Sequence, residues 1–143
     1  SNKIGERQIT LKVFAKRGKK ESEFTDTYSV IDFYNKSFIG TYNGSSANGF
    51  YISSTAVTAN GNDKITVDGG FGINFDFIIN SPTGGPLVPK MFAQGSDSYN
   101  FKSGTITKNG NFATINIILD YFDLAQPSNN LSNYSLNDVI EKQ

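Results

Sequence analysis

Three reactive residue types are missing from this chain of 143 residues, which contains no His, no Cys and no Trp. Without His and Cys, the sequence excludes Ser-His-Asp and Cys-His nucleophile systems, thiolate or imidazole metal sites, and disulfides. It also has no run of 18 or more apolar residues, so it contains no candidate for a transmembrane helix. We therefore expect a protein that is not an enzyme and that uses no metal and no other cofactor.

Charged residues are scarce and balanced. They make up 18% of the chain, against an average of roughly 25%, and 13 basic residues offset 13 acidic ones. Because no net positive field attracts a polyanion, we expect no nucleic-acid partner. Residues 1–32 nevertheless carry seven basic and five acidic side chains, whereas residues 33–143 carry six and eight. The basic cluster at 16–20 is either a solvated turn or a contact for an anionic surface.

Apolar and polar residues alternate along most of the chain, which is typical of half-buried β-strands. Asn-Gly steps at 60–61 and 109–110 predict hairpin turns, since both residues accept the positive φ that tight turns need. The sequence therefore predicts an all-β fold, either an antiparallel β-barrel or a β-sandwich of about eight strands. The segments with this pattern are 8–15, 24–32, 38–42, 50–58, 64–68, 73–79, 98–107 and 112–123.

Two segments interrupt the alternation. The glycine-rich stretch 69–72 predicts a bulge or sharp bend between strands. Residues 80–89 contain three of the four prolines, which predicts the longest loop of the chain. The cleanest apolar alternation falls in 112–123, so this segment is the best candidate for a central, well-buried strand.

The composition divides the chain into three parts. Residues 1–32 form a β-hairpin, which is either the end of a preceding small β-domain or two strands of the main sheet. Because an isolated hairpin is unstable in water, we expect it to pack against the rest. Residues 33–124 form the antiparallel main body. Residues 125–143 are expected to form a linker and a short C-terminal helix that begins at Ser135, with Asp138 completing a capping box.

Aromatic residues are frequent, with 12 Phe and 7 Tyr. Three tyrosines, Tyr42, Tyr51 and Tyr99, flank predicted turns, where an amphipathic ring can stack on a sugar or a peptide. They are the predicted ligand-binding residues, and the loops 43–49 and 81–89 are the predicted contact loops. The aromatic residues expected on the inner faces of the barrel or sandwich are Phe50, Phe75, Phe77, Phe101 and Tyr121.

Carboxylates are the remaining acid–base groups. Asp76 and Asp120 each lie on the polar side of a predicted strand. Two carboxylates about 5–10 Å apart across a cleft can hydrolyse a glycosidic bond. The same placement is found in any half-solvated sheet, so a carboxylate-dependent hydrolase ranks below a binding role.

Short motifs in the main body resemble small lipocalin-like surface lipoproteins of Bacteroidetes. The motifs are Phe38-Ile39-Gly40-Thr41-Tyr42, then Ile65-Thr66-Val67-Asp68-Gly69-Gly70-Phe71-Gly72, then Ser103-Gly104-Thr105-Ile106 followed by Asn109-Gly110. The segment 7–13, together with Tyr28-Ser29-Val30, is similar to the last two strands of a PKD or Ig-like module. The resemblance implies a lipocalin-like barrel in a lipid-anchored protein of the outer membrane, at the cell surface or otherwise extracellular. The lipidated Cys of such proteins is absent here.

These observations favour a non-catalytic binding or accessory module of the cell surface. The resemblance implies an association with outer-membrane nutrient uptake, so the expected partners are an outer-membrane protein complex or a small ligand such as a glycan. Contact with the membrane is expected only through a lipid anchor. The alternative is a structural or assembly subunit that joins its neighbours by β-strand augmentation.

Overall fold

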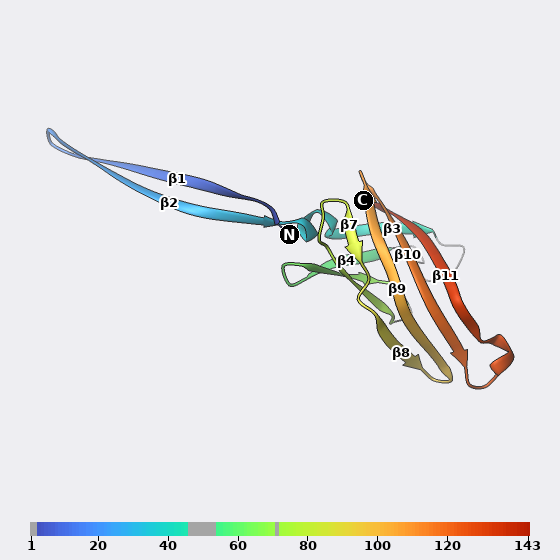
Figure 1. Ribbon diagram of the computed structural model, residues 1–143. Coiled ribbons are helices and arrows are strands. Elements are labelled where there is room, and N and C mark those ends of the chain that lie inside the picture. The colour runs from blue at the N-terminus through green and yellow to red at the C-terminus, as the bar shows by residue number, and fades with distance from the viewer. Residues whose placement is uncertain (1–2, 46–53, 71) are drawn as a thin grey trace.

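The computed structural model describes residues 3–45, 54–70 and 72–143. In this part of the chain it contains one antiparallel sheet of two strands and one of nine. The larger sheet curls into a nearly closed antiparallel β-barrel, and the smaller one projects from it as a long ribbon (Figure 1). The predicted all-β class is therefore confirmed, and of the two predicted architectures, barrel and sandwich, the structure is the barrel. Over these residues, no helix has the length and apolar character needed to cross a membrane.

The barrel is a meander that runs once around its circumference in chain order. The sheet order is β6-β5-β4-β3-β11-β10-β9-β7, and β8 also pairs with β9. The last strand, β11, pairs with both β10 and the first barrel strand, β3. The strands are β3 (Gly40–Ser45), β4 (Thr55–Asn60), β5 (Lys64–Asp68), β6 (Asn74–Ile78), β7 (Gly84–Pro86), β8 (Lys90–Gln94), β9 (Asp97–Asn109), β10 (Phe112–Asp123) and β11 (Leu131–Lys142).

The barrel closes through a seam between β6 and the segment that contains β7. The Val88 N–H donates a hydrogen bond of 2.7 Å to the carbonyl of Asp76. A glycine permits the close approach, because a Cβ added at Gly85 would lie 1.8 Å from the carbonyl oxygen of Ile78. The loop predicted at 80–89 is thus partly wrong, since it includes β7. The short strand β7 has only β9 as a ladder partner, and such an edge position tolerates Pro86.

The core consists of side chains that alternate along the barrel strands and point inward. β10 is paired on both sides, which confirms the prediction of a central, well-buried strand at 112–123. Burial of each large aliphatic or aromatic side chain contributes about 1.5–3 kcal/mol. The buried hydrophobic residues are Phe38, Tyr42, Val57, Ile65, Val67, Ile73, Phe75, Phe77, Ile79, Leu87, Phe101, Ile106, Ala113, Ile115, Ile117, Leu119, Leu136 and Ile140.

The expected C-terminal helix is wrong, because residues Leu131–Lys142 form strand β11. Leu136 and Ile140 share one face under both a helical period and a strand period, so their spacing does not separate the two structures. Asp138 decides between them, since it is 2% exposed between these two residues, while Val139 is 45% exposed. A strand here also supplies backbone partners to β10 and β3, whose edges would otherwise be open.

The N-terminal residues form a separate arm rather than part of the main sheet. Strands β1 (Lys3–Arg17) and β2 (Lys20–Phe33) pair only with each other in the described chain, and the arm projects away from the barrel (Figure 1). The expectation that this hairpin packs against the rest is therefore wrong. The short 3-10 helix η1 (Tyr34–Phe38) connects the arm to β3.

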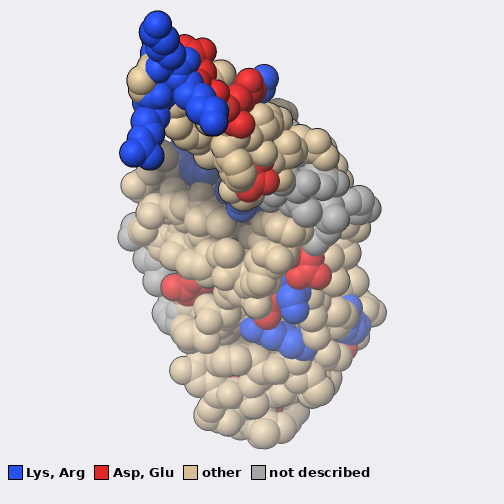
Figure 2. Space-filling view, turned by 90° about the vertical axis from the view of Figure 1, so that its left-hand side faces the viewer, with Lys and Arg blue, Asp and Glu red and all other residues tan. Residues whose placement is uncertain are grey.

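The arm is amphipathic. Register pairs place Ile9 with Tyr28 and Val13 with Phe24, all on one face together with Leu11. These five side chains are between 49% and 67% exposed. Figure 2 looks from the side of the arm and shows Lys and Arg side chains gathered at its tip.

Candidate functional site

Unequal strand lengths create a ledge at one end of the barrel. β9, β10 and β11 have 13, 12 and 12 residues, whereas β4, β5 and β6 have six, five and five. At about 3.3 Å per residue, β9 spans about 43 Å and β5 about 17 Å. The long strands therefore continue, together with β8, past the end of the short ones (Figure 1). We call this part, residues 90–94, 97–101, 119–123 and 131–134, the extension.

A row of aromatic side chains crosses the inner face of the extension. Tyr99 lies directly opposite Phe92 of β8 and directly opposite Tyr121 of β10. The ring centroids of Phe92 and Tyr99 are 6.3 Å apart, and those of Tyr99 and Tyr121 are 5.2 Å apart. All three side chains are half-buried. We call Phe92, Tyr99 and Tyr121 the aromatic row.

The aromatic row continues the core of the barrel outward. The ring of Tyr99 lies parallel to that of Phe101, with an interplanar angle of 3° and centroids 6.0 Å apart. Phe101 in turn meets Phe75 edge to face at 5.0 Å. Phe75 and Phe101 are fully buried, so the half-buried aromatic row packs against fixed side chains of the core. The row is thereby preorganised for contact with a ligand.

A carboxylate lies beside the aromatic row. The Tyr121 hydroxyl donates a hydrogen bond of 2.8 Å to Oδ1 of Asp97. This hydrogen bond is the largest cause that raises the pKa of Tyr121 to about 12. Burial, and then the negative charge of Asp97, raise the pKa of Tyr99. Both phenols are therefore neutral donors at ordinary pH, and the Asp97 carboxylate has further lone pairs to accept hydrogen bonds.

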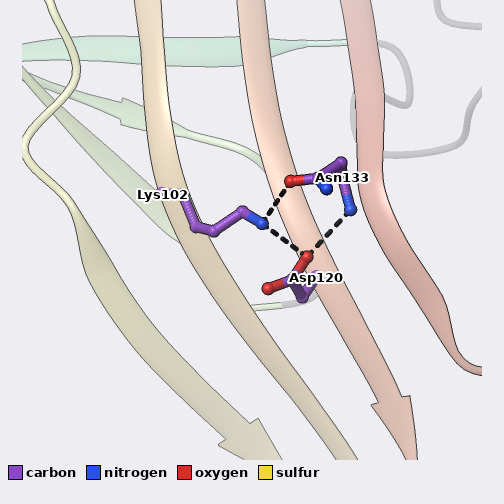
Figure 3. Close-up of polar contacts among 3 residues, drawn as sticks. All are labelled: Lys102, Asp120 and Asn133. Atoms are coloured by element: carbon purple, nitrogen blue, oxygen red, sulfur yellow. Dashed lines mark hydrogen bonds and ion pairs between the residues drawn. The ribbon is translucent and has the colours of Figure 1, made fainter.

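On the outer face, a polar cluster holds the three long strands together (Figure 3). Lys102 of β9 donates hydrogen bonds from Nζ to Oδ1 of Asp120, at 2.7 Å, and to Oδ1 of Asn133. The Asn133 N–H donates to the same Asp120 oxygen at 2.8 Å. Asn133 has a φ of 53°, in the left-handed region that Asn tolerates better than most residues. The Lys102 hydrogen bond, and then that of Asn133, lower the pKa of Asp120.

This cluster lies where the strand register shifts. β10 has irregularities between Ile118 and Leu119 in its pairing with β9, and between Leu119 and Tyr121 in its pairing with β11. Ladder hydrogen bonds are locally disrupted at such points. The side-chain hydrogen bonds of Asp120 therefore offset the disrupted ladder hydrogen bonds next to Tyr121.

The structure does not bring the two candidate hydrolase carboxylates together. Asp76 accepts hydrogen bonds from Oγ1 of Thr66 at 2.6 Å and from Nδ2 of Asn60 at 3.4 Å. It lies between the inward-pointing Phe75 and Phe77 of β6, so it faces outward, as Asp120 does on β10. β6 and β10 are not neighbours in the sheet. Each carboxylate has structural partners on its own side of the barrel.

The three predicted ligand-binding tyrosines have different positions. Tyr42 is fully buried and its hydroxyl donates a hydrogen bond of 2.8 Å to the Phe38 carbonyl, so its ring belongs to the core and is closed to a ligand. Tyr51 lies outside the described residues. Tyr99 lies at the centre of the aromatic row.

Sequence reasoning missed the partners of Tyr99. Phe92 lies on β8, a strand that the sequence pattern does not predict, and Tyr121 is predicted on the inner face of the barrel or sandwich. The signal for Tyr121 was present, since it ends the long alternation of 112–123. Of the predicted contact loops, 43–49 begins within β3 and continues outside the described residues, and 81–89 forms part of the barrel seam.

The described residues define a class: a nearly closed antiparallel β-barrel with an aromatic row on a strand extension. In residues 3–45, 54–70 and 72–143, no group of three or more acidic side chains is placed to hold a metal ion. Comparison of the chain with protein-family models, curated proteins and solved structures gave no significant match. The function is therefore argued from the geometry.

Proposed function

We propose that this protein is a non-catalytic binding module whose ligand is a small glycan bound on the aromatic row. The observation that carries the proposal is the register-aligned row Phe92, Tyr99 and Tyr121, half-exposed on rigid strands beside the Asp97 carboxylate. Sugars present apolar C–H faces that stack on aromatic rings, and hydroxyl groups that donate to a carboxylate. In the cell-surface setting that the resemblance implies, the module would act as an accessory to outer-membrane nutrient uptake.

The geometry also sets the expected affinity. The row is an open ledge rather than an enclosed pocket, so it buries only part of a ligand. We therefore expect weak binding, with a dissociation constant of about 1 mM. Longer glycans that contact all three rings should bind more tightly than monosaccharides.

The test is an NMR titration of the isotopically labelled protein with neutral oligosaccharides. The chemical shifts of the aromatic side chains and of the backbone amides are the readout. We expect saturable shifts at residues of the extension and their loss in Tyr99→Ala. Phe112→Ala is the matched control, because Phe112 is 49% exposed at the other end of β10. Shifts that do not saturate, or that persist equally in Tyr99→Ala and in the control, would contradict the proposal.

A second candidate function is self-assembly through the arm, with a second copy of the chain as the neighbour. Each arm strand has one unpaired edge in the described chain, and one arm face carries five exposed apolar side chains. A ribbon about 45 Å long and 10 Å wide offers about 450 Å² per copy. Two copies reach about 900 Å², below the roughly 1,200–2,000 Å² of stable interfaces, so edge pairing must add to face packing.

Light scattering over a range of protein concentrations tests this assembly. We expect a weak dimer that the double variant Val13→Ser, Phe24→Ser abolishes. Phe14→Ser is the control, since Phe14 is 73% exposed on the opposite face of the arm. A protein that stays monomeric at the highest concentration, or a dimer insensitive to the double variant, excludes this role.

A further inference from the structure

A hollow lies at the base of the arm, at the opposite end of β9 from the aromatic row. It has a volume of about 420 Å³. Lys108 lies nine residues along β9 from Tyr99, about 30 Å away in an extended strand. The hollow is lined by Tyr34, Ser37, Pro82, Thr83, Lys108, Asn109 and Gly110.

Two lysines from different strands converge on the backbone carbonyl of Ser37, a residue that lines the hollow. Lys108 lines the hollow itself, and Lys142 lies beside it. Lys108 of β9 donates from Nζ to the carbonyl oxygen of Ser37 at 2.6 Å, and Lys142 of β11 donates to the same oxygen at 3.5 Å. The Lys142 side chain passes over Gly40, where an added Cβ would lie 2.7 Å from the Lys142 Cε. The Lys108 ammonium lies 5.6 Å from the ring centroid of Phe38. Both side chains are therefore held in place by packing.

Positive charge gathers beside the hollow. Among the described residues, Lys36 forms an ion pair with Asp32 at 3.4 Å, whereas Lys108 and Lys142 form no ion pair. Burial, and then the positive charge of Lys142, lower the pKa of Lys108. Each ammonium has three donors, and one carbonyl uses one donor of each. Figure 2 shows Lys or Arg atoms in the shaded recess below the arm.

We propose that this hollow binds a small hydroxylated molecule that carries one oxyanion group, a carboxylate or a phosphate. The oxyanion accepts hydrogen bonds from the ammonium groups of Lys108 and Lys142, and it offsets their mutual repulsion. Tyr34 and Thr83 are also lining residues, and each carries a hydroxyl group that can serve as a polar partner for the rest of the ligand. The hollow is shallow and open to solvent, and its volume exceeds what a bare ion needs.

The experiment follows the Lys side-chain Cε and Nζ resonances of the full chain at constant ionic strength. The probes are sodium glucuronate, glucose 6-phosphate and neutral glucose. We expect saturable shifts of Lys108 and Lys142 with one or both acidic probes and none with glucose. Saturation by glucuronate alone assigns the carboxylate, and saturation by glucose 6-phosphate alone assigns the phosphate. Equal responses to glucose and to both acidic probes would overturn the proposal.

Variants separate binding from folding. Lys108→Gln should weaken binding about tenfold or more, as expected for the loss of a charge-assisted hydrogen bond. Lys19→Gln, in the exposed turn at the tip of the arm, is the matched control and should bind like the parent protein. Thr83→Val removes one hydroxyl without touching the lysines, so it tests the hollow if Lys108→Gln disturbs η1. Unchanged binding in both Lys108→Gln and Thr83→Val overturns the site.

Discussion

Tyr99 and Tyr121 lie directly opposite one another on β9 and β10, with ring centroids 5.2 Å apart, and the Tyr121 hydroxyl donates a hydrogen bond of 2.8 Å to Oδ1 of Asp97. The main cause of the raised pKa differs between these two chemically identical side chains. This difference can be measured, because the pKa of Tyr121 is raised to about 12 mainly by the Asp97 hydrogen bond, whereas burial is the first cause for Tyr99.

The first prediction concerns the alkaline titration of Tyr121. Because its folded pKa lies above the ordinary value of about 10, its contribution to stability is present below pH 10 and is lost as the pH rises toward 12. Asp97→Asn removes the carboxylate that favours the protonated phenol, so the pKa of Tyr121 should fall toward its ordinary value. Ultraviolet titration at the tyrosinate band, with Tyr121→Phe to assign the transition, measures this change. An unchanged titration in Asp97→Asn would refute the assignment.

The second prediction concerns the outer polar cluster. Asp120→Asn keeps the shape of the side chain but removes the charge that Lys102 and the Asn133 N–H stabilise. We expect faster amide hydrogen exchange in residues 131–134 and little change at the other end of β11. The pKa of Asp120 is lowered, so its contribution to stability is present above the ordinary carboxyl pKa and is lost as the pH falls through the folded value. A difference in stability between the parent and Asp120→Asn that does not shrink as the pH falls would argue against this role.

The third prediction concerns the barrel seam. Gly85→Ala places a Cβ 1.8 Å from the Ile78 carbonyl oxygen, so backbone atoms must move apart. Overpacking of this kind costs about 1–3 kcal/mol or more. Thr105→Ala, an exposed position on β9 that pairs with Pro86, is the control and should stay within about 0.5 kcal/mol. Denaturant unfolding of the parent, Gly85→Ala and Thr105→Ala measures the difference. Equal stabilities would contradict the close approach of Gly85 to Ile78 at the seam.

The fourth prediction separates strand from helix at the C-terminal segment. Val139 would share the buried face with Leu136 in a helix, but it is 45% exposed in β11. Val139→Lys should therefore change the free energy of unfolding by no more than about 0.5 kcal/mol. Leu136→Ala removes a fully buried side chain and should cost about 2–5 kcal/mol. A large loss in Val139→Lys, measured by thermal or denaturant unfolding, would favour the helical register.

Local patterns predicted the parts of the fold that depend on neighbouring residues. The Asn-Gly turns at 60–61 and 109–110 join β4 to β5 and β9 to β10, with Gly61 and Gly110 at φ of 73° and 61°. The alternation of 112–123 likewise predicted a buried strand. These features follow from the strand period and from backbone conformations that few residues adopt.

Features that depend on distant partners were not predictable in the same way. Residues 131–142 form a strand because they pair with both β10 and β3. The local sequence pattern of 131–142 does not reveal these partners. The arm shows the alternation of a packed strand, but alternation does not say what covers the apolar face. Tyr42 and Tyr99 both flank turns in the sequence. Three-dimensional packing buries Tyr42 fully and leaves Tyr99 half-buried.

The pairing of β11 with β3 has a consequence for biosynthesis. Val139 pairs with Ser45, so the barrel cannot close until nearly all of β11 has left the ribosome. Until then, β3 and β10 each keep a bare edge that is able to recruit other nascent chains. Such long-range closure also slows folding, because loop entropy is lost before the final contacts form. Substitutions in β11 should therefore reduce the yield of soluble protein in the cell more than the stability of the finished barrel suggests.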